Sequence, residues 1–397
     1  MSVQVDRSNK MLSRGAGWSA VFALTLCVGT LIASEFMPVS LLTPIASDLH
    51  MSEGQAGQAI AVSGLFAVLT SLAISSATRG IDRRNLLLAL TSLMIVSGLM
   101  VALAPNALVF MAGRAMIGMV IGGFWSMSAA TVMRLVPEQQ VAPALSLLNG
   151  GNALATTIAA PLGSFLGQFI GWRGAFFCVV PLAVITLVWQ YATLRSMPSH
   201  RGGAAANVFG VLRRRAVSIG MLSVALLFMG QFALFTYLRP YLETVTGVDV
   251  STLSAILLVL GVAGLLGTYL ISFLLNRRLY GLLIGMPLAM AALALGLTAF
   301  GASPIAVTVL LAGWGLIGTA APVAWWTWMS KVLPDDAEAG GGLMVAVIQL
   351  AITAGASVGG LLFDHSGYQS AFIAAAVVLC GSALLASAAY IMRGRAG

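Results

Sequence analysis

Apolar runs of about 18 residues or more recur along almost the whole chain, and few charged residues interrupt them. A helix rises 1.5 Å per residue, so a run of this length crosses the hydrocarbon core of a bilayer. Charged residues make up 8% of the 397 residues and hydrophobic residues 59%, whereas soluble domains contain about 25% charged residues. We therefore expect an all-α membrane protein and exclude a soluble fold.

Polar connections separate twelve apolar stretches, and each is expected to form one transmembrane helix. The expected ranges are 18–44, 57–78, 85–104, 107–130, 143–167, 174–194, 217–242, 252–275, 281–301, 305–329, 341–363 and 369–392. Only the connection 195–216 is long, and it is polar, basic and rich in Gly and Ala. It is expected to link two six-helix halves, 18–194 and 217–392, with tails at 1–17 and 393–397.

Basic residues fall almost entirely on one side of the expected membrane. Of the 20 Lys and Arg residues, only Arg173 lies in a loop on the other side, and only Arg114 and Arg239 lie within expected helices. Because cytoplasmic loops carry the excess of Lys and Arg, both termini and the linker are expected to be cytoplasmic. The net charge of +8 is thus a topology signal in short loops, and no nucleic-acid partner is expected.

The two halves of the sequence repeat each other. Residues 134–137, Arg-Leu-Val-Pro, match residues 331–334, Lys-Val-Leu-Pro. Residues 171–176 match residues 367–372, and Pro38 in the first expected helix corresponds to Pro240 in the seventh. A parallel repeat of two six-helix halves resembles the architecture of the major facilitator superfamily. That architecture implies a substrate site near the midplane and alternating access by rocking of the halves.

Glu35 lies inside the first apolar stretch, in Ser34-Glu35-Phe36-Met37-Pro38. A charged residue at the bilayer centre costs roughly 2.5–3.5 kcal/mol on insertion scales, so such residues usually face a partner or take part in ion movement. Pro38 removes a helix hydrogen bond, which neighbours must replace. Glu35 is therefore either a structural residue held by a partner or the proton-coupling site of a transporter.

Arg114 lies at a similar depth in the fourth expected helix, so it is a candidate partner for Glu35. The two residues form either a permanent structural ion pair or a site where Glu35 takes up a proton when one conformation moves it from its counter-charge. Residues His50, His200 and His365 all lie in expected loops, so no histidine relay is expected within the bundle. Residues Cys27, Cys178 and Cys380 are expected to be small buried residues, and no metal site is expected.

Side-chain amides and aromatic rings mark the expected substrate cavity. Amides read the edge of a flat polar ring and aromatic side chains stack on its face, which suits a nucleoside but also a sugar or a planar drug. The cluster Trp325, Trp326 and Trp328 fits an interfacial anchor equally well. The expected cavity residues are Trp125, Asn149, Asn152, Gln231, Phe232, Phe235, Tyr237 and Gln349.

Several motifs resemble those of the major facilitator superfamily. Residues 80–84, Gly-Ile-Asp-Arg-Arg, resemble its gating loop, although Asn85 stands where a Gly is usual. The resemblance implies that Asp82, Arg83 and Arg84, with Arg134, latch the cytoplasmic side; a mere basic topology signal is the alternative. Residues 113–118 resemble the fourth-helix motif of proton-coupled members. Residues 160–167 resemble the fifth-helix motif of exporters, although Ala160 replaces the usual Gly.

Longer blocks resemble the drug:proton antiporter branch, which includes sugar and nucleoside exporters. Residues 35–44, 122–129, 230–233, 236–240 and 345–350 are most similar to the bacterial purine ribonucleoside efflux pumps. The resemblance implies proton-driven export of nucleosides such as inosine and guanosine across a bacterial inner membrane. Arg239, near the outer end of the seventh expected helix, is a gate residue, part of the site, or a side chain that extends to the interface.

The expected protein is thus a transporter and not an enzyme, with the proton as coupling ion and with no cofactor or metal. Its expected partners are a small-molecule substrate and the lipid bilayer, and no obligatory protein partner is expected. The alternatives are a proton-driven exporter of sugars or small drugs, and a passive facilitator. Glu35 separates these mechanisms, because only a coupled carrier requires a protonatable group there.

Overall fold

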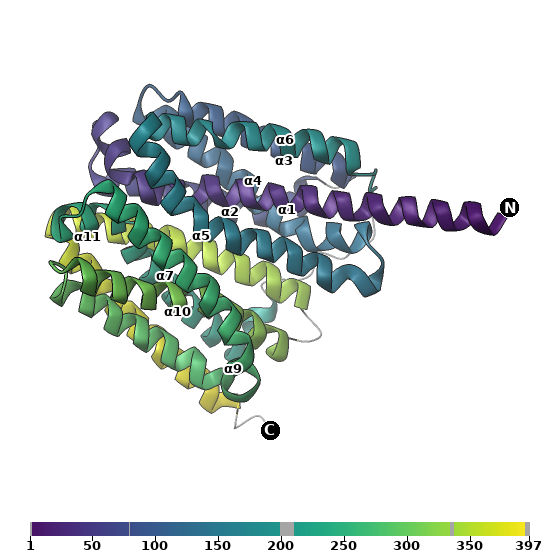
Figure 1. Cartoon of the computed structure of the whole chain (residues 1–397). Helices are drawn as coiled ribbons and strands as arrows, with labels where there is room; N and C mark the ends of the chain where they lie inside the picture. Colours follow the sequence, from purple (N-terminus) through teal and green to yellow (C-terminus); the bar gives the residue numbers. More distant parts are fainter. Residues whose placement is uncertain (1, 79, 199–209, 334–336, 394–397) are drawn as a thin grey trace.

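The computed structural model describes residues 2–78, 80–198, 210–333 and 337–393 as an all-helical bundle (Figure 1). Its first half contains α1 to α6, and its second half contains α7 to α11 with two short helical turns. The elements are α1 (Ser2–Asp48), α2 (Glu53–Ala77), α3 (Arg83–Ala102), α4 (Ala107–Leu135), α5 (Glu138–Phe177), α6 (Val179–Thr193), η1 (Gly210–Arg213), α7 (Arg215–Phe235), α8 (Leu238–Tyr241), η2 (Leu242–Thr246), α9 (Val250–Ala299), α10 (Pro304–Val332) and α11 (Ala337–Arg393).

Ten helical stretches in the described part are long and apolar enough to cross a membrane, which confirms the expected all-helical membrane architecture. Two of them run for 55 and 53 residues, more than twice the roughly 20 residues that one crossing needs. Each contains one glycine with a positive φ, Gly171 at 71° and Gly367 at 76°. Helix α9 is interrupted at Arg278, whose φ of −142° and ψ of 36° are not helical. The chain therefore turns within these long helices.

The helix boundaries differ from the expected ranges at two places. Helix α1 begins at Ser2, where a tail was predicted over 1–17. Helix α7 ends at Phe235, because Pro240 has no N–H to offer the Thr236 carbonyl; the chain continues in α8 and a single π-helical turn, η2. Residues 199–209 of the expected linker and 394–397 of the expected C-terminal tail lie outside the described residues.

The sequence repeat corresponds to a structural repeat. The matched residues Gly171 and Gly367 adopt the same backbone conformation, with ψ of 168° and 175°. The N-terminus of α4 is capped by the Asn106 side chain, and that of α10 by the Ser303 side chain. Aromatic rings pack edge-on after each glycine, at centroid distances of 6.3 Å for Trp172–Phe176 and 5.9 Å for Tyr368–Phe372.

Glycines allow close packing of equivalent helices in both halves. A Cβ atom on Gly118 of α4 would lie 2.1 Å from the Ser63 carbonyl oxygen of α2, and one on Gly122 would lie 2.2 Å from that of Ala67. In the second half, a Cβ atom on Gly315 of α10 would lie 2.1 Å from the Leu260 carbonyl oxygen of α9. Small residues on α4 and α10 therefore form helix-packing surfaces.

The two halves pack around largely separate cores and meet mainly at one end. One apolar cluster consists mostly of residues 217–386 and another of residues 20–197. Helices α2 and α11 run side by side, with hydrogen bonds from Gly54 N–H to Asp364 Oδ1 at 2.9 Å and from Ser357 Oγ to Gln58 Oε1 at 2.9 Å. We call this end, where α1 finishes and α2 begins, the closed end of the bundle.

The opposite end of the bundle also has exposed side chains. Met133 on the last turns of α4 is 55% exposed, and Trp326 on α10 is 39% exposed. Figure 1 shows the α1–α6 half and the α7–α11 half diverging in the direction of the start of α1. Hydrogen bonds that join the halves within the described residues also include Thr353 Oγ1 to the Ala61 carbonyl at 3.3 Å and Thr157 Oγ1 to the Gly261 carbonyl at 3.2 Å.

We expect Gly118→Ala and Gly315→Ala each to lower the free energy of unfolding by about 1–3 kcal/mol, because the new methyl group would overlap a backbone carbonyl. Thermal unfolding of the purified protein in detergent measures the effect. The matched control is Gly285→Ala in α9, where an added Cβ has no neighbour within 4 Å; its free energy of unfolding should stay the same or rise by up to about 1 kcal/mol. Equal losses in all three variants would contradict the close-packing argument.

Candidate functional site

Pro38 leaves a backbone carbonyl of α1 without its helix partner, and Arg114 replaces that partner. In an α-helix the N–H of residue 38 would donate to the carbonyl of Ser34, but proline has no N–H. The Arg114 guanidinium of α4 donates to the Ser34 carbonyl at 2.7 Å and to the Glu35 carbonyl at 3.0 Å. It also donates to the Ala59 carbonyl at 3.2 Å and to Ser63 Oγ at 3.3 Å, both on α2. Arg114 therefore ties three helices of the first half together.

The predicted proximity of Glu35 and Arg114 is confirmed, but the contact is not a direct ion pair. The hydrogen bonds of Arg114 within the described residues go to backbone carbonyls and a hydroxyl. The Glu35 side chain, with the residue only 4% exposed, interacts with the charge of Arg114 and with the side chain of Gln349 on α11. A carboxylate from one half thus faces an amide from the other.

Aromatic side chains make a second contact between the two halves. Phe36, which follows Glu35 in α1, stacks on Phe232 of α7 with ring centroids 6.0 Å apart, and meets Phe235 edge-on at 6.5 Å. Two of the predicted aromatic residues therefore lie against the first half of the molecule. Phe36 itself was missed, although its place beside Glu35 in the same motif was a usable signal.

Gln231 lies next to Phe232 and contacts another carbonyl that a proline has freed. Pro322 of α10 cannot donate to the Gly318 carbonyl, and Gln231 Nε2 approaches that oxygen at 3.5 Å. The Oε1 atoms of Gln231 and Gln349 are both buried without a hydrogen-bond partner. Buried polar atoms normally have partners, so these two acceptors are candidates to bind a substrate. We call Glu35, Phe36, Gln231, Phe232, Phe235 and Gln349 the central site.

The other predicted cavity residues lie away from these contacts. Asn149 is exposed and donates to the Leu145 carbonyl of its own helix at 2.9 Å. Asn152 on α5 is half-buried, and Trp125 is half-buried and meets Phe124 edge-on at 6.0 Å. Tyr237 is fully buried in the contact of α2 with α11, where its hydroxyl donates to the Ala356 carbonyl at 2.7 Å.

The tryptophan cluster of α10 separates into two environments. Trp325 and Trp328 are each 1% exposed and pack against each other at a centroid distance of 5.3 Å, which rules out an interfacial role for these two. Trp326 is exposed at 39% and fits a place at the surface. The indole Nε1 atoms of Trp325 and of Trp314 are buried without a partner. Cys178 and Cys380 are exposed, so the expectation that all three cysteines are buried was wrong for these two.

The predicted gate residues gather around the segment that follows α6. Asp82 caps α3 and accepts from the N–H of Arg84 at 2.8 Å and of Met197 at 2.9 Å, and from the Ser196 hydroxyl. Although desolvation opposes the effect, these hydrogen bonds hold the pKa of Asp82 below its usual range. The other gate residues donate to backbone carbonyls of the same segment. The N–H of Arg83 donates to the Met197 carbonyl at 3.1 Å. Arg84 Nη2 donates to the Tyr191 carbonyl at 3.0 Å, and Arg134 Nη1 donates to the Pro198 carbonyl at 3.1 Å.

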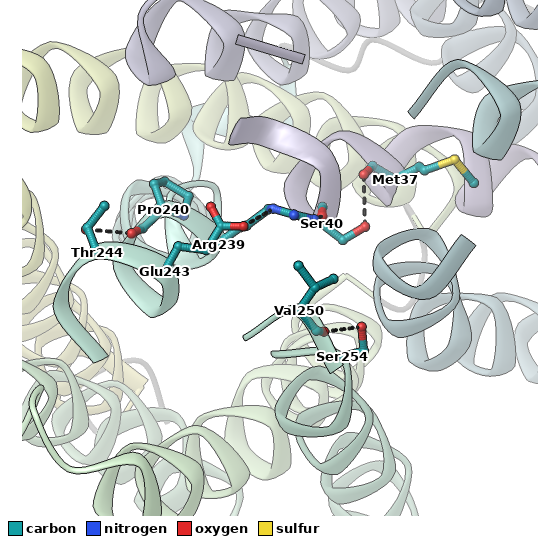
Figure 2. Close-up of polar contacts among 8 residues, drawn as sticks. All are labelled: Met37, Ser40, Arg239, Pro240, Glu243, Thr244, Val250 and Ser254. Carbon is teal, nitrogen blue, oxygen red and sulfur yellow. Dashed lines mark hydrogen bonds and ion pairs between the residues drawn. The ribbon is translucent and has the colours of Figure 1, made fainter. Parts of the chain in front are cut away.

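Arg239 binds across the two halves at the closed end (Figure 2). Its Nη1 donates to the Ser40 carbonyl of α1, and its Nε pairs with Glu243 Oε1 at 2.8 Å. Arg239 is 6% exposed, so it does not extend to the interface as one expectation had it. The acceptor could be foreseen from the sequence, because Pro44 stands four residues after Ser40 and cannot donate to its carbonyl.

Relatives of known name match nearly the whole chain. The protein is 57% identical over 388 residues to the transcription regulatory protein OpdE of Pseudomonas aeruginosa, with 96% of both chains covered. It is 42% identical over 376 residues to the purine ribonucleoside efflux pump NepI of Escherichia coli K12, with 95% of both chains covered.

Solved structures show the same fold at low identity. A bacterial homologue of the human lysosomal transporter Spinster superposes with a TM-score of 0.78 at 16% identity, over 94% of this chain and 97% of the other. The nucleoside transporter NupG superposes with a TM-score of 0.75 at 12% identity, over 94% and 99%. The sequence model of the Major Facilitator Superfamily matches residues 21–345. The chain therefore belongs to the major facilitator superfamily and is a membrane transporter, not an enzyme.

Proposed function

We propose that this transporter is a proton-coupled antiporter that exports purine ribonucleosides, such as inosine and guanosine, across a bacterial inner membrane. In this proposal the chain crosses the membrane twelve times, in two six-helix halves, and both termini lie in the cytoplasm. The closed end then faces outward, and the described conformation is open towards the cytoplasm. The observation that carries the proposal is the buried Glu35 carboxylate of α1 facing Gln349 of α11 beside stacked aromatic rings.

The position of Glu35 suits proton coupling. Its side chain lies where the two halves meet, so its surroundings change when the halves rock apart. Arg114 supplies a fixed positive charge from the first half, because its hydrogen bonds to α1 and α2 do not involve the second half. Rocking would then remove Gln349 from Glu35 and leave Arg114 in place. Different surroundings in the two states give a carboxylate different proton affinities.

The central site also suits a purine ribonucleoside. Phe36, Phe232 and Phe235 offer aromatic faces for a flat ring. The buried acceptors of Gln231 and Gln349 can receive N–H and O–H groups, which purines and ribose supply. The identity to NepI, whose name gives purine ribonucleosides as its cargo, favours this class over sugars or small drugs. A one-unit pH gradient supplies about 1.4 kcal/mol per proton, enough for roughly a tenfold substrate gradient.

The name of the Pseudomonas relative concerns transcription. A membrane carrier can affect transcription by changing the internal concentration of a small effector, so this name is compatible with transport. The alternatives within the superfamily are a proton-driven exporter of sugars or small drugs and a passive facilitator.

The predicted gate residues contact one another's neighbourhood within the first half. In the described conformation Asp82, Arg84 and Arg134 contact the segment around Tyr191–Pro198 of their own half. We assign them to a latch that closes the cytoplasmic side in the outward-facing state. Trp125, Asn149 and Asn152 would line the path between that latch and the central site, and Tyr237 would form part of the outer closure.

We expect Glu35→Gln to abolish substrate-driven proton movement, because glutamine cannot carry the proton. Proteoliposomes loaded with a pH-sensitive dye measure proton flux after addition of inosine or guanosine, and the flux should fall at least about tenfold, to the level of empty vesicles. The matched control is Glu53→Gln at the start of α2, outside the central site. Unchanged flux in Glu35→Gln would make Glu35 a structural residue, and inosine uptake without any proton flux in the wild type would favour a facilitator.

We expect Gln231→Leu to raise the KM for inosine about three- to tenfold, since one hydrogen bond contributes about 0.5–1.5 kcal/mol. Concentration-dependent uptake into inverted membrane vesicles measures the KM. Gln168→Leu on the exposed end of α5 is the control. A normal KM in Gln231→Leu, or saturable transport of sugars with no transport of nucleosides, would contradict the proposed cargo contacts.

A further inference from the structure

We propose that Arg239 is a releasable latch of the outer end, and that Pro44 creates its acceptor. The Arg239 guanidinium on α8 donates to the Ser40 carbonyl on α1 and so joins the two halves (Figure 2). This inference rests on the alternating access of the proposed function, but it does not depend on the cargo or on proton coupling.

The acceptor is available because of the sequence of α1. Pro44 lies inside the helix and has no N–H to donate to the Ser40 carbonyl. In a membrane protein a buried carbonyl without a donor is costly, so a neighbouring side chain must satisfy it. Ser40 is fully buried, and its own hydroxyl donates back to the Met37 carbonyl at 3.1 Å. Arg239 is the donor from the other half that meets this need.

The latch can open because its charge is neutralised within its own half. Glu243 lies four residues after Arg239 and pairs with its Nε at 2.8 Å. Three other carboxylates at the closed end have different partners: Asp48 pairs with Arg173, Asp364 accepts from Ser52 and Gly54, and Asp249 accepts from Ser251 and Thr252. When the halves separate, Arg239 and Glu243 move together. No unpaired buried charge is left behind, which would otherwise be strongly unfavourable.

Arg114 provides a comparison within the same helix. It also donates to a carbonyl that a proline has freed, that of Ser34 before Pro38. However, Arg114 and Ser34 belong to the same half, so rocking does not separate them. The two prolines of α1 thus have different consequences: Pro38 fixes helices within one half, and Pro44 creates a bond that each transport cycle must break.

The backbone around Glu243 has an irregular conformation that is consistent with movement. Residues Leu242–Thr246 form a single π-helical turn that ends at Gly247, which has a φ of 68°. Such turns are rare and occur frequently at functional sites. The Oε2 atom of Glu243 is buried without a partner, so this carboxylate has acceptor capacity left for Arg239 once the guanidinium leaves the Ser40 carbonyl.

The test measures the opening of the outer end without substrate or gradient. Spin labels at Ser47 and Ser366, which are exposed at the closed end on opposite halves, report their separation by pulsed dipolar spectroscopy in a background with Cys27, Cys178 and Cys380 replaced by Ser. Arg239→Lys keeps the positive charge but removes the planar guanidinium. A single ammonium group cannot reproduce the two hydrogen bonds that the guanidinium donates in different directions, to the Glu243 carboxylate and to the Ser40 carbonyl. Pro44→Ala gives the Ser40 carbonyl a helix donor and leaves Arg239 unchanged.

We expect both variants to increase the ratio of open (long-distance) to closed (short-distance) molecules about tenfold or more. The reason is that each variant weakens one hydrogen bond from a charged group that is present only in the closed state. The control Pro287→Ala makes the same change inside α9 and should leave the distances as in the wild type. The elution volume in size-exclusion chromatography verifies that each variant is folded. Wild-type distances in both Arg239→Lys and Pro44→Ala would overturn the latch, whatever the transport assays find.

Discussion

The structure depends on one constraint: a backbone carbonyl within a membrane bundle must find a donor, because the hydrocarbon core offers no water. Prolines in α1 and α10 remove three such donors. The freed carbonyls of Ser34, Ser40 and Gly318 are contacted by Arg114, Arg239 and Gln231, respectively. Each of these polar side chains would be expensive to bury alone. The prolines and the buried polar side chains therefore explain one another, and together they position the central site.

These contacts also distinguish what moves from what does not. Within the first half, Arg114 joins α4 to α1 and α2, and close glycine contacts join α4 to α2. Within the second half, equivalent glycine contacts join α9 to α10. Between the halves, the described hydrogen bonds include those of α2 with α11, that of Arg239 with Ser40 and that of Thr157 with Gly261. A bundle built in this way can rock as two rigid bodies, which is the motion that alternating access requires.

Much of the fold follows from the sequence alone. Apolar runs predict the helices, and the matched residues around Gly171 and Gly367 predict the repeat, because a local turn depends on local residues. The depth of Glu35 and Arg114 follows from helix rise. The identity of their partners does not, since it depends on how helices rotate against each other. Residue type suggested that Tyr237 and Asn149 line a cavity, whereas packing buries Tyr237 between α2 and α11 and leaves Asn149 exposed. Phe36 was missed because an aromatic residue in an apolar helix carries no signal of its own.

The pairing of Arg239 with Glu243 has an electrical consequence. A unit charge that crosses the whole membrane potential exchanges about 2.3 kcal/mol per 100 mV with the field. Because this cation and anion lie on consecutive turns of one half, they are displaced together and carry no net charge through the field. Release of the outer contact is then insensitive to voltage. In the proposed antiport cycle, the buried charges that remain to respond to voltage are those of Glu35 and Arg114, and protonation of Glu35 changes the net charge that this pair carries.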